Sequence, residues 1–167
     1  MTATDSSTVE RTVIVEASPA RAFDVFTARI DTWWPKTHHI GTAPMKESRI
    51  ECRVGGRCYS VHEDGASVDW GKVLVWEPPH RLVLAWQVTH QWRYEPDLAK
   101  ASEVEVCFTA LEGGKTRVDL EHRYFERMGP GGDEMRTAVA GGWGKLLEMF
   151  AAQAGEEKAG DEKESHA

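Results

Sequence analysis

Alternating apolar and polar residues run along much of the chain, which is the pattern of strands that bury one face. The first run spans residues 9–17, where Val9, Val13 and Val15 share a face. Six further runs lie between Glu47 and Tyr124, centred on residues 50–54, 57–63, 69–76, 82–88, 104–108 and 118–122. Short turns separate most neighbours, and Gly55-Gly56 is interpreted as a two-residue hairpin turn. Strands joined by such turns pair antiparallel, so the pattern predicts a meander.

Helical spacing appears at two places. Ser18 and Pro19 supply an N-cap and a first helical residue, and apolar positions follow at helical spacing until Trp33-Trp34, before Pro35 ends the segment. A second helix, about twenty residues long, follows Gly132 and carries one apolar stripe. The stripe consists of Met135, Val139, Trp143, Leu146, Leu147 and Phe150. The order of strand, helix, six strands and long helix predicts an α+β fold.

Three glycines lie inside the predicted C-terminal helix. Gly141, Gly142 and Gly144 surround Trp143, and each costs the helix about 1 kcal/mol relative to alanine. Either a close approach of the helix to the sheet or room for a ligand would explain them. The spacing alone does not separate these explanations.

The composition indicates one core domain with polar ends. We expect a flexible N-terminus over residues 1–8, a domain over residues 9–153 and a disordered acidic tail over residues 154–167. The net charge is −7 and no basic stripe appears, which argues against nucleic-acid binding. The sequence shows neither a membrane-length apolar stretch nor a signal-peptide pattern, so we expect a cytoplasmic protein without membrane insertion.

The sequence offers little enzymatic or metal-binding chemistry. The three cysteines, Cys52, Cys58 and Cys107, have no CxxC spacing, so free thiols and no bound metal are expected. No nucleotide-binding glycine loop, HExxH motif or GxSxG motif is present. The adjacent His38 and His39 lack further metal-ligand spacing, and we interpret them as part of a solvated loop.

His122 is the most informative polar residue, because alternation places it on the inward face with Val118 and Leu120, followed by Tyr124. A polar group on a core face needs a partner. His122 is therefore either a core histidine satisfied by the protein or, with Tyr124, the polar corner of a cavity.

Five segments resemble START-like (SRPBCC) proteins, and within them the family related to the activator of the heat-shock-protein-90 ATPase. They are residues 12–23, 54–57, 71–86, 116–122 and 142–147. The resemblance covers residues 9–153 and implies the helix-grip (START-like, Bet v-like) fold, a curved seven-stranded antiparallel sheet around a long C-terminal helix. It also implies a cavity; relatives bind small apolar molecules, and some catalyse cyclisation or dehydration. The eukaryotic activator has an additional domain that this chain is too short to include, so a chaperone partner is not expected.

We therefore expect non-enzymatic binding of a small apolar or aromatic ligand, without a cofactor, between the sheet and the C-terminal helix. The expected lining is Trp34, Tyr59, Trp86, Phe108, His122, Tyr124 and Trp143. One alternative is a small cyclase, dehydratase or hydrolase with His122 as general base, since the reference pKa of histidine is near neutral. Another is a stress-response protein that acts on a chaperone. A homodimer is left open.

Overall fold

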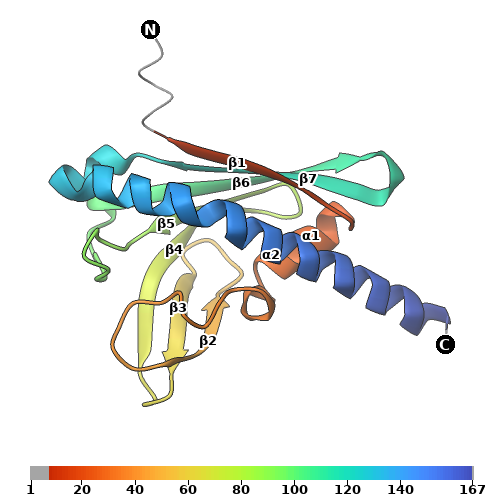
Figure 1. Cartoon of the computed structure of the whole chain (residues 1–167), viewed down its shortest axis with the longest axis horizontal. Coiled ribbons are helices and arrows are strands. Elements are labelled where there is room, and N and C mark those ends of the chain that lie inside the picture. Colours follow the sequence, from red (N-terminus) through yellow and green to blue (C-terminus); the bar gives the residue numbers. More distant parts are fainter. Residues whose placement is uncertain (1–7, 167) are drawn as a thin grey trace, which may run out of the picture.

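The computed structural model describes the backbone of residues 8–166 and the side chains of residues 8–156. Residues 1–7, within the segment expected to be flexible, lie outside the described residues. Seven strands form one antiparallel sheet in the order β1-β7-β6-β5-β4-β3-β2 (Figure 1). The strands are β1 (Val9–Val15), β2 (Met45–Ile50), β3 (Arg57–His62), β4 (Ser67–Glu77), β5 (Arg81–Trp86), β6 (Ser102–Leu111) and β7 (Lys115–Arg123).

The sheet curves, and the C-terminal helix α2 (Gly132–His166) lies across it (Figure 1). The apolar stripe of α2 is buried: Met135, Val139, Trp143, Leu146, Leu147 and Phe150 all belong to the core. At the sheet edge, the Arg11 guanidinium of β1 donates to the Ala140 carbonyl of α2 at 2.7 Å. This is the predicted α+β architecture of a curved seven-stranded antiparallel sheet around a long C-terminal helix.

The first helix, α1 (Pro19–Phe26), begins as predicted but ends earlier. The Ser18 side chain caps it by accepting from the Arg21 amide at 3.2 Å. The buried Thr27 hydroxyl donates to the Phe23 carbonyl at 2.7 Å, and the backbone of Thr27 leaves the helical region. A short 3-10 helix (Ile30–Thr32) then leads to the tryptophan pair, so the predicted single helical segment is in fact two pieces.

The predicted Gly55-Gly56 hairpin turn is wrong. Strand β2 ends at Ile50, which pairs with Cys58, and the intervening residues 51–56 form a longer connection. Gly55 takes a positive φ of 82°, and its amide donates to the Val73 carbonyl of β4 at 2.8 Å. The connection therefore folds back onto β4, and Cys52 lies beyond the end of β2.

Helix α2 is longer than predicted. Its backbone continues to His166, whereas the sequence analysis placed the end of the ordered chain near residue 154. Ala154 is fully buried and belongs to the core, so the helix remains packed at this point. The side chains of residues 157–167 lie outside the described residues.

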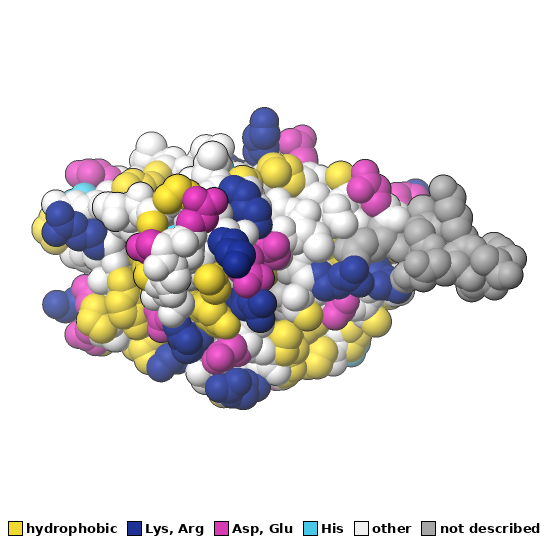
Figure 2. Space-filling view, turned by 90° about the horizontal axis from the view of Figure 1, so that it is seen from below, with side chains coloured by type: hydrophobic (Ala, Val, Ile, Leu, Met, Phe, Trp, Pro, Cys, Tyr) yellow, Lys and Arg dark blue, Asp and Glu magenta, His cyan; other side chains and the backbone are white. Residues whose placement is uncertain are grey.

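Charges of both signs are mixed on one face of the molecule (Figure 2). Figure 2 shows Lys and Arg side chains interspersed with Asp and Glu on the face that it presents. On the outer face of the sheet, Arg123 forms ion pairs with Glu103, Glu105 and Glu121 at 3.3, 2.9 and 3.0 Å. In the part of the chain that the structure describes, no helix combines the length and apolar character that a membrane crossing requires.

Candidate functional site

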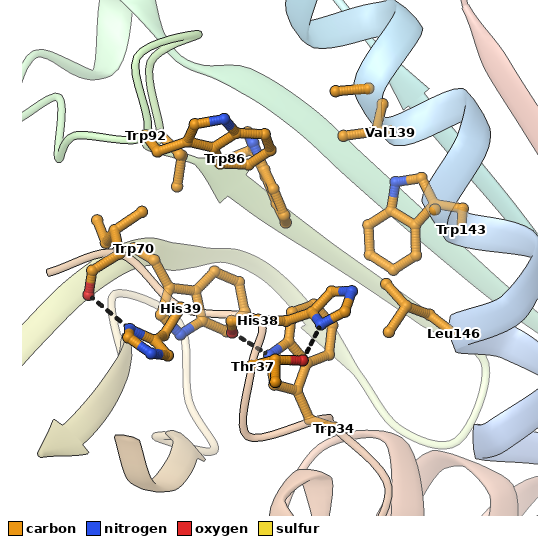
Figure 3. Close-up of a pocket in the computed structure, with 14 residues that line it drawn as sticks. Trp34, Thr37, His38, His39, Trp70, Trp86, Trp92, Val139, Trp143 and Leu146 are labelled. Carbon is orange, nitrogen blue, oxygen red and sulfur yellow. Dashed lines mark hydrogen bonds between the residues drawn. The ribbon is translucent and has the colours of Figure 1, made fainter. Parts of the chain in front are cut away.

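One end of the space between the sheet and α2 is filled, and the other is hollow. Near α1, Phe108 contacts Phe23 and Phe26 with ring centroids 5.1 and 6.1 Å apart, and Phe26 packs against Phe150 of α2 at 5.1 Å. Beyond this aromatic cluster, a cavity of about 320 Å³ lies between the sheet, α2 and two loops (Figure 3). Its lining consists of Trp34, Thr37, His38, His39, Ile40, Trp70, Trp86, Val88, Trp92, Ala138, Val139, Gly142, Trp143 and Leu146.

Four buried tryptophans line this cavity, and each contacts the next so that the last also contacts the first. We call them the tryptophan ring: Trp34, Trp70, Trp86 and Trp143. Trp34 and Trp70 are stacked at 5.8 Å with 7° between their planes. The successive contacts Trp70–Trp86, Trp86–Trp143 and Trp143–Trp34 are edge-on at 5.8, 5.9 and 6.2 Å. These four side chains come from the loop before β2, from β4, from β5 and from α2. Their indole rings form apolar walls of the cavity.

Hydrogen bonds fix two members of the tryptophan ring. Trp34 Nε1 donates to the His38 carbonyl at 2.7 Å, and Trp143 Nε1 donates to His122 Nδ1 at 3.1 Å. In contrast, Trp86 Nε1 is buried and has no hydrogen-bond partner among the described residues. The orientation of the Trp86 ring is therefore set by packing alone.

His122 lies behind the tryptophan ring and does not line the cavity. Because Trp143 Nε1 can only donate, His122 Nδ1 accepts, and the proton of the neutral imidazole is on Nε2, which donates to Ser102 Oγ at 2.8 Å. Burial lowers the pKa of His122 to about 3. The imidazole is fully buried, neutral and engaged at both nitrogens, so it is a satisfied core histidine that orients Trp143. This geometry contradicts its alternative role as a general base.

Three other predicted lining residues also lie away from the cavity. Phe108 is buried in the cluster around α1. Tyr59 points to the outer face of β3, where the Arg57 guanidinium lies 4.2 Å above its ring. Tyr124 follows the end of β7 with a positive φ of 66°, which turns its side chain outward, so that it is 38% exposed and contacts Arg127 at 4.2 Å. Of the seven predicted residues, Trp34, Trp86 and Trp143 are brought together at the cavity.

The structure decides between the two explanations of the helix glycines. A Cβ atom built on Gly141, Gly142 or Gly144 would meet no atom within 4 Å outside the helix itself. The glycines therefore do not mark a close approach of α2 to the sheet. Gly142 lines the cavity, so at this position the missing side chain leaves space open.

The rim of the cavity carries residues that the sequence analysis did not assign to a site. Thr37, His38 and His39 come from the loop after the tryptophan pair, and Trp92 comes from the loop after β5. Trp92 is 50% exposed and has a positive φ of 61°, a conformation that is unfavourable for a large side chain. The adjacency of the histidines was visible in the sequence, whereas nothing in it indicated that their loop borders a cavity.

The lining is chemically sparse. It contains no Asp, Glu, Lys or Arg, so histidine supplies the titratable groups. Among the described residues, no group of three or more His, Cys, Asp or Glu side chains is arranged to hold a metal ion. Cys52, Cys58 and Cys107 are free. The arrangement is suited to holding a flat apolar molecule with few polar contacts.

The comparisons with known proteins agree with this architecture. Residues 16–155 match the family model described as "Activator of Hsp90 ATPase homolog 1-like protein". A solved structure described as an "anthrahydroquino-Gama-pyrone synthase Txn09" is similar, with 38% sequence identity and a TM-score of 0.63, covering 87% of this chain and 95% of that one. A search of curated proteins gave no significant match.

Two further structures show how widely the fold is shared. The "self-sacrificing resistance protein, CalC from Micromonospora echinospora" has 27% identity and a TM-score of 0.64, covering 91% of this chain and 96% of that one. Protein NE0264 from Nitrosomonas europaea has 15% identity and a TM-score of 0.66, covering 92% and 97%. The second similarity concerns the fold alone.

Proposed function

The chain belongs to the Activator of Hsp90 ATPase homolog 1-like family, and from this premise we propose that it binds a small planar aromatic molecule in the cavity bounded by the tryptophan ring. The observation that carries the proposal is the combination of four buried, mutually contacting indoles with a lining free of carboxylates, lysine and arginine. The volume of about 320 Å³ falls at the lower end of the range of small-molecule sites.

Aromatic walls favour a flat aromatic occupant for two reasons. Burial of apolar area supplies most of the affinity, and stacked or edge-on contact between rings adds about 0.5–1.5 kcal/mol per pair. Trp86 adds a buried indole ring whose N–H has no hydrogen-bond partner among the described residues. The solved relative that is 38% identical is described as a synthase of an anthrahydroquino-pyrone, a name that denotes fused rings, and this supports the same class of ligand here.

A fluorescence titration with N-phenyl-1-naphthylamine, a neutral probe that brightens in apolar surroundings, tests the proposal. The matched variants are Trp92→Ala and Tyr94→Ala, because both residues are exposed and lie in the same loop, but only Trp92 lines the cavity. We expect the wild type to bind the probe, Trp92→Ala to weaken binding several-fold, and Tyr94→Ala to leave the affinity unchanged. No binding by the wild type, or equal losses in both variants, would refute the proposal.

A second function, an enzyme that converts such a molecule, is favoured by one observation. The relative that is 38% identical is described as a synthase, and His38 places an imidazole at the cavity rim where it can reach a ligand. The two functions are separated by extracting small molecules from protein purified from its own host and returning each to fresh protein. Recovery of the compound with its mass unchanged supports binding, and recovery of a compound of different mass supports an enzyme.

A further inference from the structure

His38 is the more exposed of the two histidines in the cavity lining. Trp34 Nε1 and Trp143 Nε1 are already engaged with the protein, and Trp86 Nε1 is shielded by packing. His39 Nδ1 contacts the Ile40 carbonyl at 3.3 Å, and the His39 ring packs edge-on against His62 at 5.1 Å. The remaining imidazole, that of His38, is exposed in the free protein.

The position of the His38 ring is defined by two contacts. His38 Nδ1 and Thr37 Oγ1 are 3.1 Å apart, and the imidazole meets the Trp34 ring edge-on at 6.3 Å (Figure 3). The His38 carbonyl accepts a hydrogen bond from Trp34 Nε1. The backbone of His38 is therefore held next to Trp34, a member of the tryptophan ring. With Nδ1 facing Thr37, Nε2 is the ring nitrogen that remains for a ligand.

We infer that His38 selects ligands that carry a hydroxyl group on the edge of the aromatic system, by a hydrogen bond from its Nε2 to that hydroxyl. The inference rests on the proposed function and names the substrate class of the same site. Partial burial lowers the pKa of His38, which favours the neutral ring, and in a neutral imidazole one nitrogen is a donor while the other is an acceptor. The Thr37 hydroxyl accepts from His38 Nδ1 when this nitrogen carries the proton and donates to it when it does not.

A hydroxyl group is the substituent that fits both tautomers. A phenolic or enolic hydroxyl can donate to Nε2 when Nδ1 carries the proton, and it can accept from Nε2 when Nδ1 does not. A methyl ether can only accept, and a bare hydrocarbon can do neither. A ligand without a hydroxyl displaces the water that hydrogen-bonds to Nε2. Because such a ligand does not replace this hydrogen bond in both tautomers, its binding is weaker.

The test compares three probes of nearly equal shape, naphthalene, 2-methoxynaphthalene and 2-naphthol, by isothermal titration calorimetry. A net hydrogen bond of ordinary strength corresponds to a preference of about fivefold to tenfold. We expect the wild type to prefer 2-naphthol by this factor, His38→Leu to lose the preference while still binding naphthalene, and His38→Gln to retain part of it. The His38 carbonyl bond to Trp34 is made by the backbone and survives each substitution.

The matched control is His80→Leu, because His80 is an exposed histidine in the turn between β4 and β5 and lies outside the cavity lining. This variant should bind all three probes like the wild type. If naphthalene binds but 2-naphthol gains nothing, or if His38→Leu keeps the preference, the inference about His38 is wrong and the proposed function stands. If none of the probes binds the wild type, both fail.

Discussion

Alanine substitutions at the two neighbouring helix glycines should separate stability from binding. Gly141 is exposed and Gly142 lines the cavity, while a Cβ at either position meets no atom within 4 Å outside the helix. Glycine in a helix interior costs about 1 kcal/mol relative to alanine, so both Gly141→Ala and Gly142→Ala should stabilise the protein by up to that amount. For a domain of this size, this corresponds to a rise in Tm of about 2–4 °C.

Binding should respond to one of the two substitutions only. The methyl group of Gly142→Ala enters the cavity next to Trp143, and one carbon in an apolar site is worth about 1 kcal/mol or more, which is several-fold in Kd. Gly141→Ala places its methyl group away from the cavity and should leave the Kd unchanged.

The assay pairs thermal unfolding with titration of N-phenyl-1-naphthylamine for the wild type and both variants. A stability gain in both variants with weaker binding in Gly142→Ala alone is the expected result. A loss of stability in both would show that the helix needs glycine for close packing, and equal affinities in the two variants would show that the probe does not occupy the space beside Gly142.

Two further predictions concern buried titratable groups. Because the pKa of His122 falls from 6.5 to about 3 on folding, the unfolded chain binds a proton between these values that the folded protein does not, so stability falls as the pH drops through this window. The loss of unfolding free energy from pH 7 to pH 5, measured in urea, should be smaller by about 2 kcal/mol in His122→Gln than in the wild type, and an equal loss would contradict the buried neutral imidazole. Burial also raises the pKa of the Cys58 thiol, so a disulfide reagent should label exposed Cys52 first and Cys58 only on unfolding, whereas equally fast labelling of both would be inconsistent with this core.

The fold could be predicted from the sequence because its local signals agree with one another. Alternation, turn residues and a single apolar helix stripe each pointed to the same meander and C-terminal helix. The errors in predicted side-chain direction arose where the residues of a strand depart from the rule that the inward face is the more apolar one. In β3 the inward face carries Ser60 and His62, which satisfy each other at 2.7 Å, so the more apolar Tyr59 was wrongly placed inside.

The candidate site was predicted only in part, for physical reasons that the residues show. Trp86 and Trp143 lie on regular elements, where periodicity gives the direction of a side chain. Trp92 lies in a loop, where no periodicity applies, and the positive φ of Tyr124 reversed the direction that alternation implied. The location of the cavity depends on how far α1 and Phe108 fill the other end of the core, which is a property of the packed molecule.

The most direct test of the proposed binding site is an NMR titration that follows the indole N–H signals of the seven tryptophans in the ¹⁵N-labelled protein. Signals are assigned by single Trp→Phe variants, and N-phenyl-1-naphthylamine is added to saturation. Trp34, Trp70, Trp86, Trp92 and Trp143 line the cavity, whereas Trp33 donates to the Val25 carbonyl and Trp76 packs against Phe23. We predict large shifts for the five lining indoles and small shifts for Trp33 and Trp76. Shifts largest at Trp33 or Trp76, or no shifts at saturating probe, would contradict binding in the tryptophan-lined cavity.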